Sequence, residues 1–85
     1  MIRLRLLSRP GCHLCHEMRR EVDALLGEAP RAWEEVDVDS DPALAARWGE
    51  AIQVLLVNGR LFAKIRLPRL SARRRLLRAA GLSPG

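Results

Sequence analysis

Two cysteines separated by two residues follow an apolar run and a Pro-Gly turn near the start of the chain. Cys12 and Cys15 lie in the stretch SRPGCHLCH, residues 8–16. If a strand ends before this turn and a helix begins after it, Cys12 lies at the helix N-terminus, where unpaired backbone N–H groups and the helix dipole favour a thiolate. A cysteine in such a position has a lowered thiol pKa and is more reactive at neutral pH.

The second cysteine is expected one helical turn further along. There Cys15 is close enough to form a disulfide with Cys12 but lies deeper in the helix and is less exposed. The spacing therefore predicts a dithiol redox pair, with Cys12 as the nucleophile and Cys15 as the resolving thiol. The alternative is a pair of inert structural cysteines, or a redox site that has lost its activity.

Two histidines adjoin the cysteines and could join them as ligands for zinc or an iron–sulfur cluster. On a helix, His16 shares the face of Cys12 while His13 points elsewhere, so the four side chains do not readily form a tetrahedral site. We therefore predict no metal site within one chain and assign His13 to tuning the thiolate and contacting substrate. A metal that bridges two copies through Cys12 remains an alternative.

Length and composition indicate a small globular protein. The chain has 85 residues, of which 48% are hydrophobic, and we assign residues 1–85 to a single domain. Two cysteines can form only one disulfide, which is too few to stabilise a small secreted protein. The first residues also lack the apolar core of a signal peptide, so we expect a cytoplasmic location. Arginines interrupt every apolar run, so neither a membrane span nor a membrane partner is expected.

The formal charge of +5 is unevenly distributed along the chain. All ten acidic residues lie between Glu17 and Glu50, and the residues that follow carry only basic charge. This basic third is either a solvated surface or a docking surface for an acidic protein or the carboxylate of glutathione. Nucleic acid is not expected as a partner, because the chain has no recognisable nucleic-acid-binding motif and only three aromatic residues on which bases could stack. We expect a monomer.

The spacing of apolar residues alternates between a period of two and a helical period, which indicates an α/β fold. Strand, helix and strand at the start of the chain predict a parallel crossover, and the tight Asn58-Gly59 turn predicts an antiparallel hairpin. The result is a mixed four-stranded sheet with three helices. The expected elements are strand 2–7, helix 12–26, strand 33–39, helix 42–48, strand 54–57, strand 60–65 and helix 68–80.

The same spacing predicts which side chains are buried. The inner face of the first helix is expected to contain Leu14, Cys15, Met18, Val22, Leu25 and Leu26. The inner face of the last helix is expected to contain Leu70, Ala72, Leu76, Leu77 and Ala80. The aromatic residues Trp33, Trp48 and Phe62 are expected in the core.

The order βαβαββα, with a C-x-x-C at the first strand-to-helix turn, resembles the thioredoxin fold and, at this length, its glutaredoxin-like branch. The segments that carry the resemblance are 7–15, 36–39, 41–44 and 54–59, and together they are similar to small bacterial glutaredoxin-like proteins. The resemblance implies a thiol–disulfide oxidoreductase that needs no bound cofactor. Its partner would be a disulfide-containing protein or glutathione, with glutathione as a candidate reductant.

The chain departs from the family pattern at the loop before the third strand, where relatives carry a cis-proline that faces the C-x-x-C. Here Ile52-Gln53 occupies that loop, and we expect a trans peptide because a cis bond before a non-proline residue costs about 3 kcal/mol. The glycine pair that many glutaredoxins use to hold glutathione is replaced by residues 62–64. We therefore assign Ile52 and Gln53 to substrate binding but expect weak glutathione-dependent activity and easier metal access at Cys12.

Charged residues flank the predicted site. Arg9 precedes the Pro-Gly-Cys turn and is expected beside Cys12, where it could stabilise the thiolate or bind a substrate carboxylate. Asp37 and Asp39 are either loop charges or a proton acceptor for Cys15. The alternative function is a redox-inactive or metal-binding thioredoxin-fold module that docks on a protein partner through its basic C-terminal helix.

Overall fold

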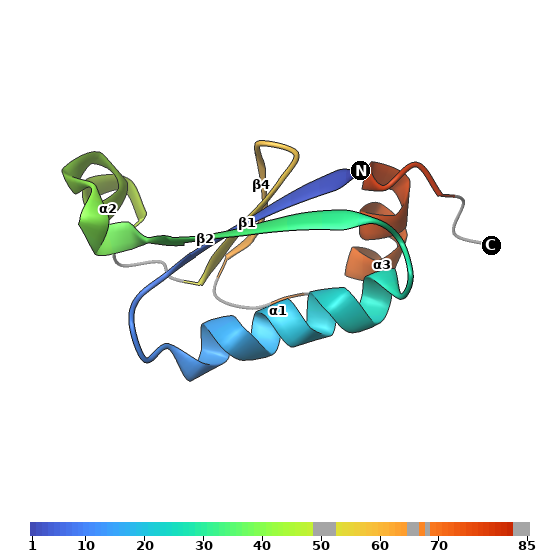
Figure 1. The fold of residues 1–85 in the computed structure, drawn as a ribbon, viewed down its shortest axis with the longest axis horizontal. Helices are drawn as coiled ribbons and strands as arrows, with labels where there is room; N and C mark the ends of the chain where they lie inside the picture. Colours follow the sequence, from blue (N-terminus) through green and yellow to red (C-terminus); the bar gives the residue numbers. More distant parts are fainter. Residues whose placement is uncertain (49–52, 65–66, 68, 83–85) are drawn as a thin grey trace.

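The computed structural model describes residues 1–48, 53–64, 67 and 69–82 (Figure 1). The elements are, in chain order, β1 (Ile2–Ser8), α1 (His13–Leu26), β2 (Arg31–Asp37), the 3-10 helix η1 (Val38–Ser40), α2 (Pro42–Trp48), β3 (Val54–Val57), β4 (Arg60–Lys64) and α3 (Arg69–Ala79). This order confirms the predicted βαβαββα arrangement. None of the helices in the described ranges is long and apolar enough to cross a membrane.

The four strands form one mixed sheet in the order β2-β1-β3-β4. β1 runs parallel to β2 and antiparallel to β3, and β3 and β4 form the predicted hairpin. Asn58 and Gly59 both have positive φ, as a tight hairpin turn of this kind requires. Because β1 is central, its alternating side chains set the two faces of the sheet: Leu4 and Leu6 are buried on one face, while Arg3 and Arg5 are exposed on the other.

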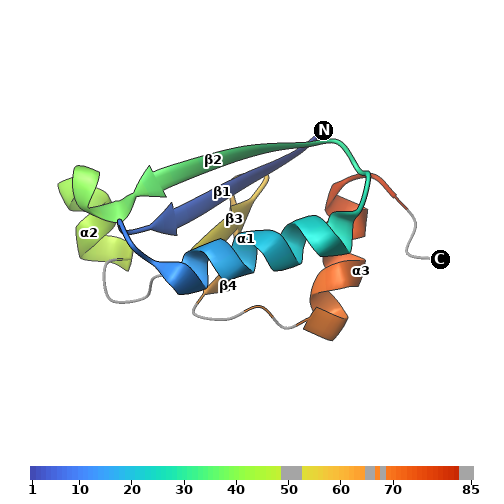
Figure 2. The ribbon, with the colours of Figure 1, turned by 60° about the horizontal axis from the view of Figure 1, so that its bottom comes forward.

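Helices α1 and α3 pack on the same face of the sheet and against each other (Figures 1 and 2). Buried side chains of the sheet and of both helices form the core between these layers: Ile2, Leu4, Leu6, Leu55 and Val57 from the strands, and Cys15, Met18, Val22, Leu26, Ala72 and Leu76 from the helices. The short helix α2 instead packs against η1 at one end of the sheet. The core therefore anchors α1, and with it the C-x-x-C, to the central strand.

The second strand lies two residues earlier than predicted. It begins at Arg31, which is in register with Ile2, and it ends at Asp37 rather than at residue 39. The strand ends there because the Asp37 side chain accepts a hydrogen bond from the backbone N–H of Asp39, at 2.9 Å, which bends the chain into η1. The alternation of apolar and acidic residues continues to residue 39 and therefore predicted a longer strand. The local hydrogen bond of the Asp37 side chain ends the strand earlier.

Two leucines assigned to buried helix faces are exposed. Leu14 is 61% exposed and Leu70 is 98% exposed. The buried stripe of α1 runs through Cys15 and Met18, and Leu14 lies about 100° around the helix from Cys15. Leu70 is two residues from the buried Ala72, so it lies on nearly the opposite side of α3.

The aromatic residues lie at the edge of the core rather than inside it. Trp33 and Phe62 pack against the core cluster but are only partly buried. Arginine guanidinium groups lie over their rings, Arg19 at 5.0 Å from Trp33 and Arg75 at 4.1 Å from Phe62. Trp48, on α2, is also partly buried. The predicted glycine stop at residue 49, the strand end at residue 65 and the helix start at residue 68 lie outside the described residues.

Candidate redox site

Cys12 and Cys15 form a disulfide across the start of α1, with their Cα atoms 5.4 Å apart. Cys12 is the N-cap of the helix and has an extended backbone conformation. Its Sγ accepts a hydrogen bond from the backbone N–H of Cys15 at 3.3 Å. The sulfur of Cys12 therefore satisfies one of the N–H groups that a helix N-terminus leaves without an intrahelical partner.

The two sulfur atoms differ in their surroundings. Cys12 is partly exposed, whereas Cys15 is 0% exposed and belongs to the core cluster between the sheet and the helices. A disulfide in another molecule can reach only a sulfur at the surface. Of the two cysteines, Cys12 is thus the one that another molecule can approach.

A tight turn connects β1 to the disulfide. The strand ends at Ser8, and the backbone N–H of Cys12 donates a hydrogen bond to the Arg9 carbonyl at 3.1 Å. Gly11 has a φ of 78°, in the left-handed region that residues with a Cβ avoid. The Pro-Gly sequence therefore supplies the conformation that brings the chain from the central strand to the helix N-cap within four residues.

Sequence and structure comparisons place this arrangement in a family. Residues 3–76 match the profile described as Glutaredoxin-like domain (DUF836). The chain belongs to this glutaredoxin-like family. A structural genomics target protein from X. campestris is 30% identical, with a TM-score of 0.64 over 86% of this chain and 93% of that one. No curated protein matches the sequence.

Two thioredoxins of known structure share the fold of this glutaredoxin-like protein. A mutant thioredoxin from Halobacterium salinarum NRC-1 is 19% identical, with a TM-score of 0.62 over 98% of this chain and 78% of that one. Mitochondrial thioredoxin 3 from Saccharomyces cerevisiae, in its oxidised form, is 22% identical, with a TM-score of 0.50 over 76% of this chain and 65% of that one. These neighbours confirm the predicted thioredoxin-like α/β fold.

In the glutaredoxin-like site, the guanidinium of Arg9 is bound by a carboxylate. Nε and one terminal nitrogen of Arg9 donate to the two carboxylate oxygens of Asp39, at 2.9 and 3.3 Å. Both side chains are about half exposed. The ion pair ties the turn before Cys12 to η1. The role of Arg9 in substrate binding stays a prediction, and the structure adds that Asp39 must share or release the guanidinium.

The histidines lie at the start of α1. His13 is its first residue and is exposed, and His16 is exposed one turn later. Within the described part of the chain, no three His, Cys, Asp or Glu side chains lie close enough together to hold a metal ion. The assignment of His13 to substrate contact or to tuning of the thiolate stays a prediction.

Gln53, which was assigned to substrate binding, lies at the same edge of the sheet as the turn before Cys12. Gln53 is 5% exposed and directly precedes β3, whose first residue Val54 pairs with Leu7 of β1. Gln53 therefore lies beside the strand end that leads to Cys12. Ile52 and the Ile52–Gln53 peptide bond lie outside the described residues. The trans state of that bond therefore stays a prediction.

Sequence reasoning missed two features of the site. One is the contact between Arg9 and Asp39, which are thirty residues apart in sequence. The other is the exposed Leu14, which lies directly before Cys15 and places an apolar side chain at the surface beside the disulfide. The Asp and Ser residues at 37 and 39–41 were the available signal for a turn near the site, because their side chains favour such turns.

Proposed function

We propose that this protein is a thiol–disulfide oxidoreductase in which Cys12 is the nucleophile and Cys15 the resolving thiol. The observation that carries the proposal is the position of Cys12: a partly exposed N-cap whose sulfur accepts a hydrogen bond from the Cys15 N–H. After reduction, the same N–H group and the positive end of the α1 dipole stabilise a thiolate at Cys12. The buried Cys15 is held next to it for the second step.

The proposed reaction consists of two exchange steps. The Cys12 thiolate attacks one sulfur of the substrate disulfide, that S–S bond breaks, and the released substrate thiolate takes up a proton. Cys15 then loses its proton and attacks the Cys12 sulfur of the mixed disulfide. The second substrate thiol leaves, the Cys12–Cys15 disulfide forms, and two electrons have passed to the substrate. A thiol reductant such as glutathione must reduce the pair before the next cycle.

The substrate we propose is a protein disulfide, contacted by Arg9, His13 and Gln53 around the Cys12 sulfur. The exposed His13 and Leu14 lie between the two cysteines in sequence, so the surface next to the disulfide is partly polar and partly apolar. Ile52 completes the proposed contact set from the loop before β3. We propose the monomer as the active unit, because the cysteine pair that performs both steps lies within one chain.

The pH dependence of alkylation tests the proposed nucleophile. In fully reduced protein we expect iodoacetamide to modify Cys12 well before Cys15, because Cys12 is the more exposed sulfur and its thiolate is stabilised at the helix N-terminus. The half-maximal rate should occur below the pH of about 8.5 that is typical of a free thiol. Rates are measured between pH 4 and 9, with mass spectrometry of the peptides to identify the modified residue. Equal labelling of both cysteines, or a midpoint at or above that of a free thiol, would contradict the assignment.

A proline at the loop before β3 should increase activity. In relatives, the cis-proline turns the preceding backbone toward the substrate and shields the thiols from metals, and glutamine restores a backbone N–H and the preference for a trans peptide. We expect Gln53→Pro to raise the rate of protein disulfide reduction and to lower zinc uptake by the reduced protein. Gln53→Ala is the matched control, because it removes the side chain without adding the ring. A folded Gln53→Pro variant with both properties unchanged would contradict this account of the loop.

A second candidate function is docking through α3. The favouring observation is the nearly complete exposure of Leu70, with Arg73 and Arg74 one turn further along α3 and Arg78 about two turns further. These three arginines are exposed and form no ion pair within the described part of the chain. An apolar side chain within a cationic surface suits an acidic protein with a small apolar pocket. A partner that binds equally well after both cysteines are replaced by serine would favour this function.

A further inference from the structure

The face of the sheet opposite α1 and α3 carries a hollow that the redox chemistry does not use. Arg3 and Arg5 of β1 project onto this face, next to Ala32 and Glu34 of β2 and Leu56 of β3, with which they are in register. The hollow has a volume of about 680 Å³, within the roughly 300–1,000 Å³ range of small-molecule sites. It is therefore large enough for a small organic ligand.

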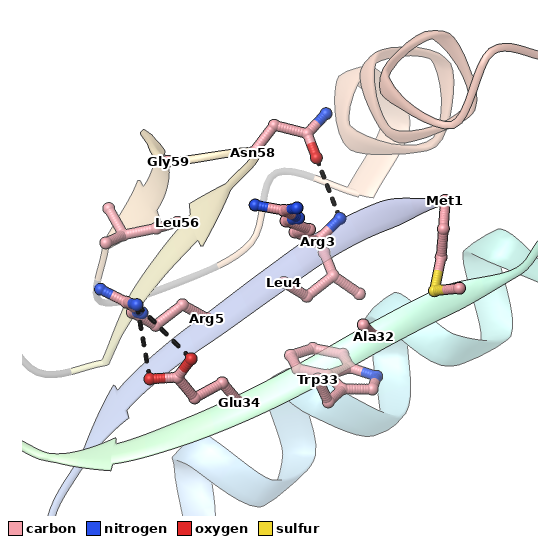
Figure 3. Close-up of a pocket in the computed structure, with 10 residues that line it drawn as sticks. All are labelled: Met1, Arg3, Leu4, Arg5, Ala32, Trp33, Glu34, Leu56, Asn58 and Gly59. Carbon is pink, nitrogen blue, oxygen red and sulfur yellow. Dashed lines mark hydrogen bonds and ion pairs between the residues drawn. The ribbon is translucent and has the colours of Figure 1, made fainter.

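The two arginines of the hollow differ in their partners (Figure 3). Arg5 forms an ion pair with Glu34 at 3.4 Å, so these two charges largely neutralise each other. The Arg3 guanidinium has no hydrogen-bond or ion-pair partner among the described residues. The Arg3 guanidinium is therefore an uncompensated positive side chain in the hollow, and this group binds carboxylate or phosphate oxygens in a bidentate manner.

The rim beside Arg3 is fixed by hydrogen bonds. The backbone N–H of Arg3 donates to Asn58 Oδ1 at 2.9 Å, and the backbone N–H of Asn58 donates to the Arg3 carbonyl at 2.8 Å. The Asn58 Nδ2 group donates to the Ala79 carbonyl at 3.4 Å, which joins the same turn to the end of α3. The backbone that positions Arg3 is thus preorganised, which reduces the entropic cost of binding a ligand there.

Apolar groups form the wall of the hollow next to these charges. Leu56 is partly buried and Ala32 is exposed, and both lie on this face within the hollow. The Glu34 carboxylate lies on the other side of the hollow from Arg3, beside Arg5 (Figure 3). An available guanidinium, an apolar wall and a nearby carboxylate suit a ligand with a single anionic group and an apolar body, and the carboxylate disfavours a polyanion.

We propose that this hollow binds a small organic anion whose single anionic group pairs with Arg3 and whose apolar body lies on Leu56 and Ala32. The site is formed by the first half of β1, whereas the Cys12 turn follows the other end of that strand (Figure 1). Binding is therefore independent of the redox state of the disulfide. The site adds a ligand-binding property to the proposed oxidoreductase and does not depend on it.

Titration of the ¹⁵N-labelled full chain with naphthalene-2-carboxylate, followed by NMR, tests the proposal. We expect amide shifts at Arg3, Ala32 and residues 56–59, and weaker binding of the neutral isostere naphthalene-2-methanol. Arg3→Gln should weaken binding of the carboxylate about fivefold, the size expected for one solvent-exposed charge-assisted pair. Arg20→Gln, which removes an exposed arginine of α1, is the matched control and should leave binding unchanged.

Two further measurements separate this site from the redox site. Titration of the oxidised protein and of a variant with both cysteines replaced by serine should give the same affinity, and Arg3→Gln should retain the disulfide reductase activity of the unmodified chain. A comparison with 2-naphthyl phosphate shows whether a carboxylate or a phosphate is the preferred anionic group. Amide shifts centred elsewhere, equal binding of the neutral isostere, or an Arg3→Gln variant with unchanged affinity would each overturn the proposal.

Discussion

Replacing Cys12 with serine should abolish disulfide reduction, lowering the rate to that of the uncatalysed control. A serine hydroxyl is not ionised at neutral pH and cannot form the mixed disulfide on which both steps depend. The buried Cys15 cannot substitute for it, because its sulfur is enclosed between the sheet and the helices. The measurement is the rate of reduction of a protein disulfide by the prereduced variant, with thiol release followed in time.

The matched variant, Cys15→Ser, should instead stop the reaction halfway. Cys12 remains at the N-cap and attacks the substrate, but no thiol is left to resolve the mixed disulfide. We expect a covalent adduct with the substrate, visible as a mass increase that a strong reductant reverses. Cys12→Ser should give no such adduct. Full activity in Cys12→Ser, or an adduct formed equally by both variants, would show that the roles are assigned to the wrong residues.

The order of the elements could be predicted because local patterns determine it. Alternation of Leu4 and Leu6 with Arg3 and Arg5 marks a strand with one buried face, and the structure has that strand at the centre of the sheet. The Asn58-Gly59 pair marks the hairpin, and both residues adopt the positive φ that the turn needs. Each of these signals depends only on neighbouring residues.

The position of Cys12 could be predicted for the same reason. A Pro-Gly turn after a strand and before a helical pattern places the next residue at the N-cap, and the Sγ atom of Cys12 accepts a hydrogen bond from the helix backbone there. The difference in exposure between Cys12 and Cys15 was also predicted from their spacing. Cys12 is at the end of the helix, whereas Cys15 lies about one turn further along it, where the helix packs on the sheet.

The errors concern contacts that span the chain. The helical spacing of apolar residues predicted that Leu14 and Leu70 would be buried. Burial depends on which side of each helix meets the sheet, and both leucines lie outside the buried stripe of their helix. Asp39 was not assigned to Arg9, because only the bend at Asp37 brings η1 to the turn before Cys12. No pattern of neighbouring residues encodes a contact between residues that are thirty positions apart.

Arg31 illustrates the same limit, because it lay between the predicted helix 12–26 and the predicted strand 33–39 and no role was assigned to it. Its side chain, 16% exposed, reaches back to the end of α1. There it donates to the carbonyl of Asp23 at 3.1 Å, to that of Ala29 at 2.9 Å, and to that of Gly27. Gly27 and Ala29 belong to the turn that follows α1, and the Asp23 carbonyl also accepts the Gly27 backbone N–H at 3.0 Å. Arg31 therefore holds this turn against the last turn of α1, where a positive charge is favourable.

The Asp23 carboxylate completes this cluster of hydrogen bonds. Its Oδ1 accepts hydrogen bonds from Arg31 and from Trp33 Nε1, both at 2.8 Å. Burial by itself raises the pKa of Asp23, but these hydrogen bonds and the positive charges of Arg31 and Arg19 outweigh it, so the pKa lies below its ordinary value. The cluster links the end of α1 to the start of β2, and so holds the crossover that precedes the second strand.

Arg31→Met should therefore lower the free energy of unfolding by about 1.5–3 kcal/mol, the range for hydrogen bonds to charged groups. Arg20→Met, on the exposed side of α1, is the control and should change it little. Because the pKa of Asp23 is depressed on folding, its contribution is present above the unfolded value of about 3.9 and is lost as the pH falls through the folded value. Urea unfolding between pH 2 and 7 should show this acid loss in the unmodified chain and a smaller one in Asp23→Asn. If Arg31→Met unfolded at the same urea concentration as Arg20→Met, the guanidinium would not be what holds the end of α1.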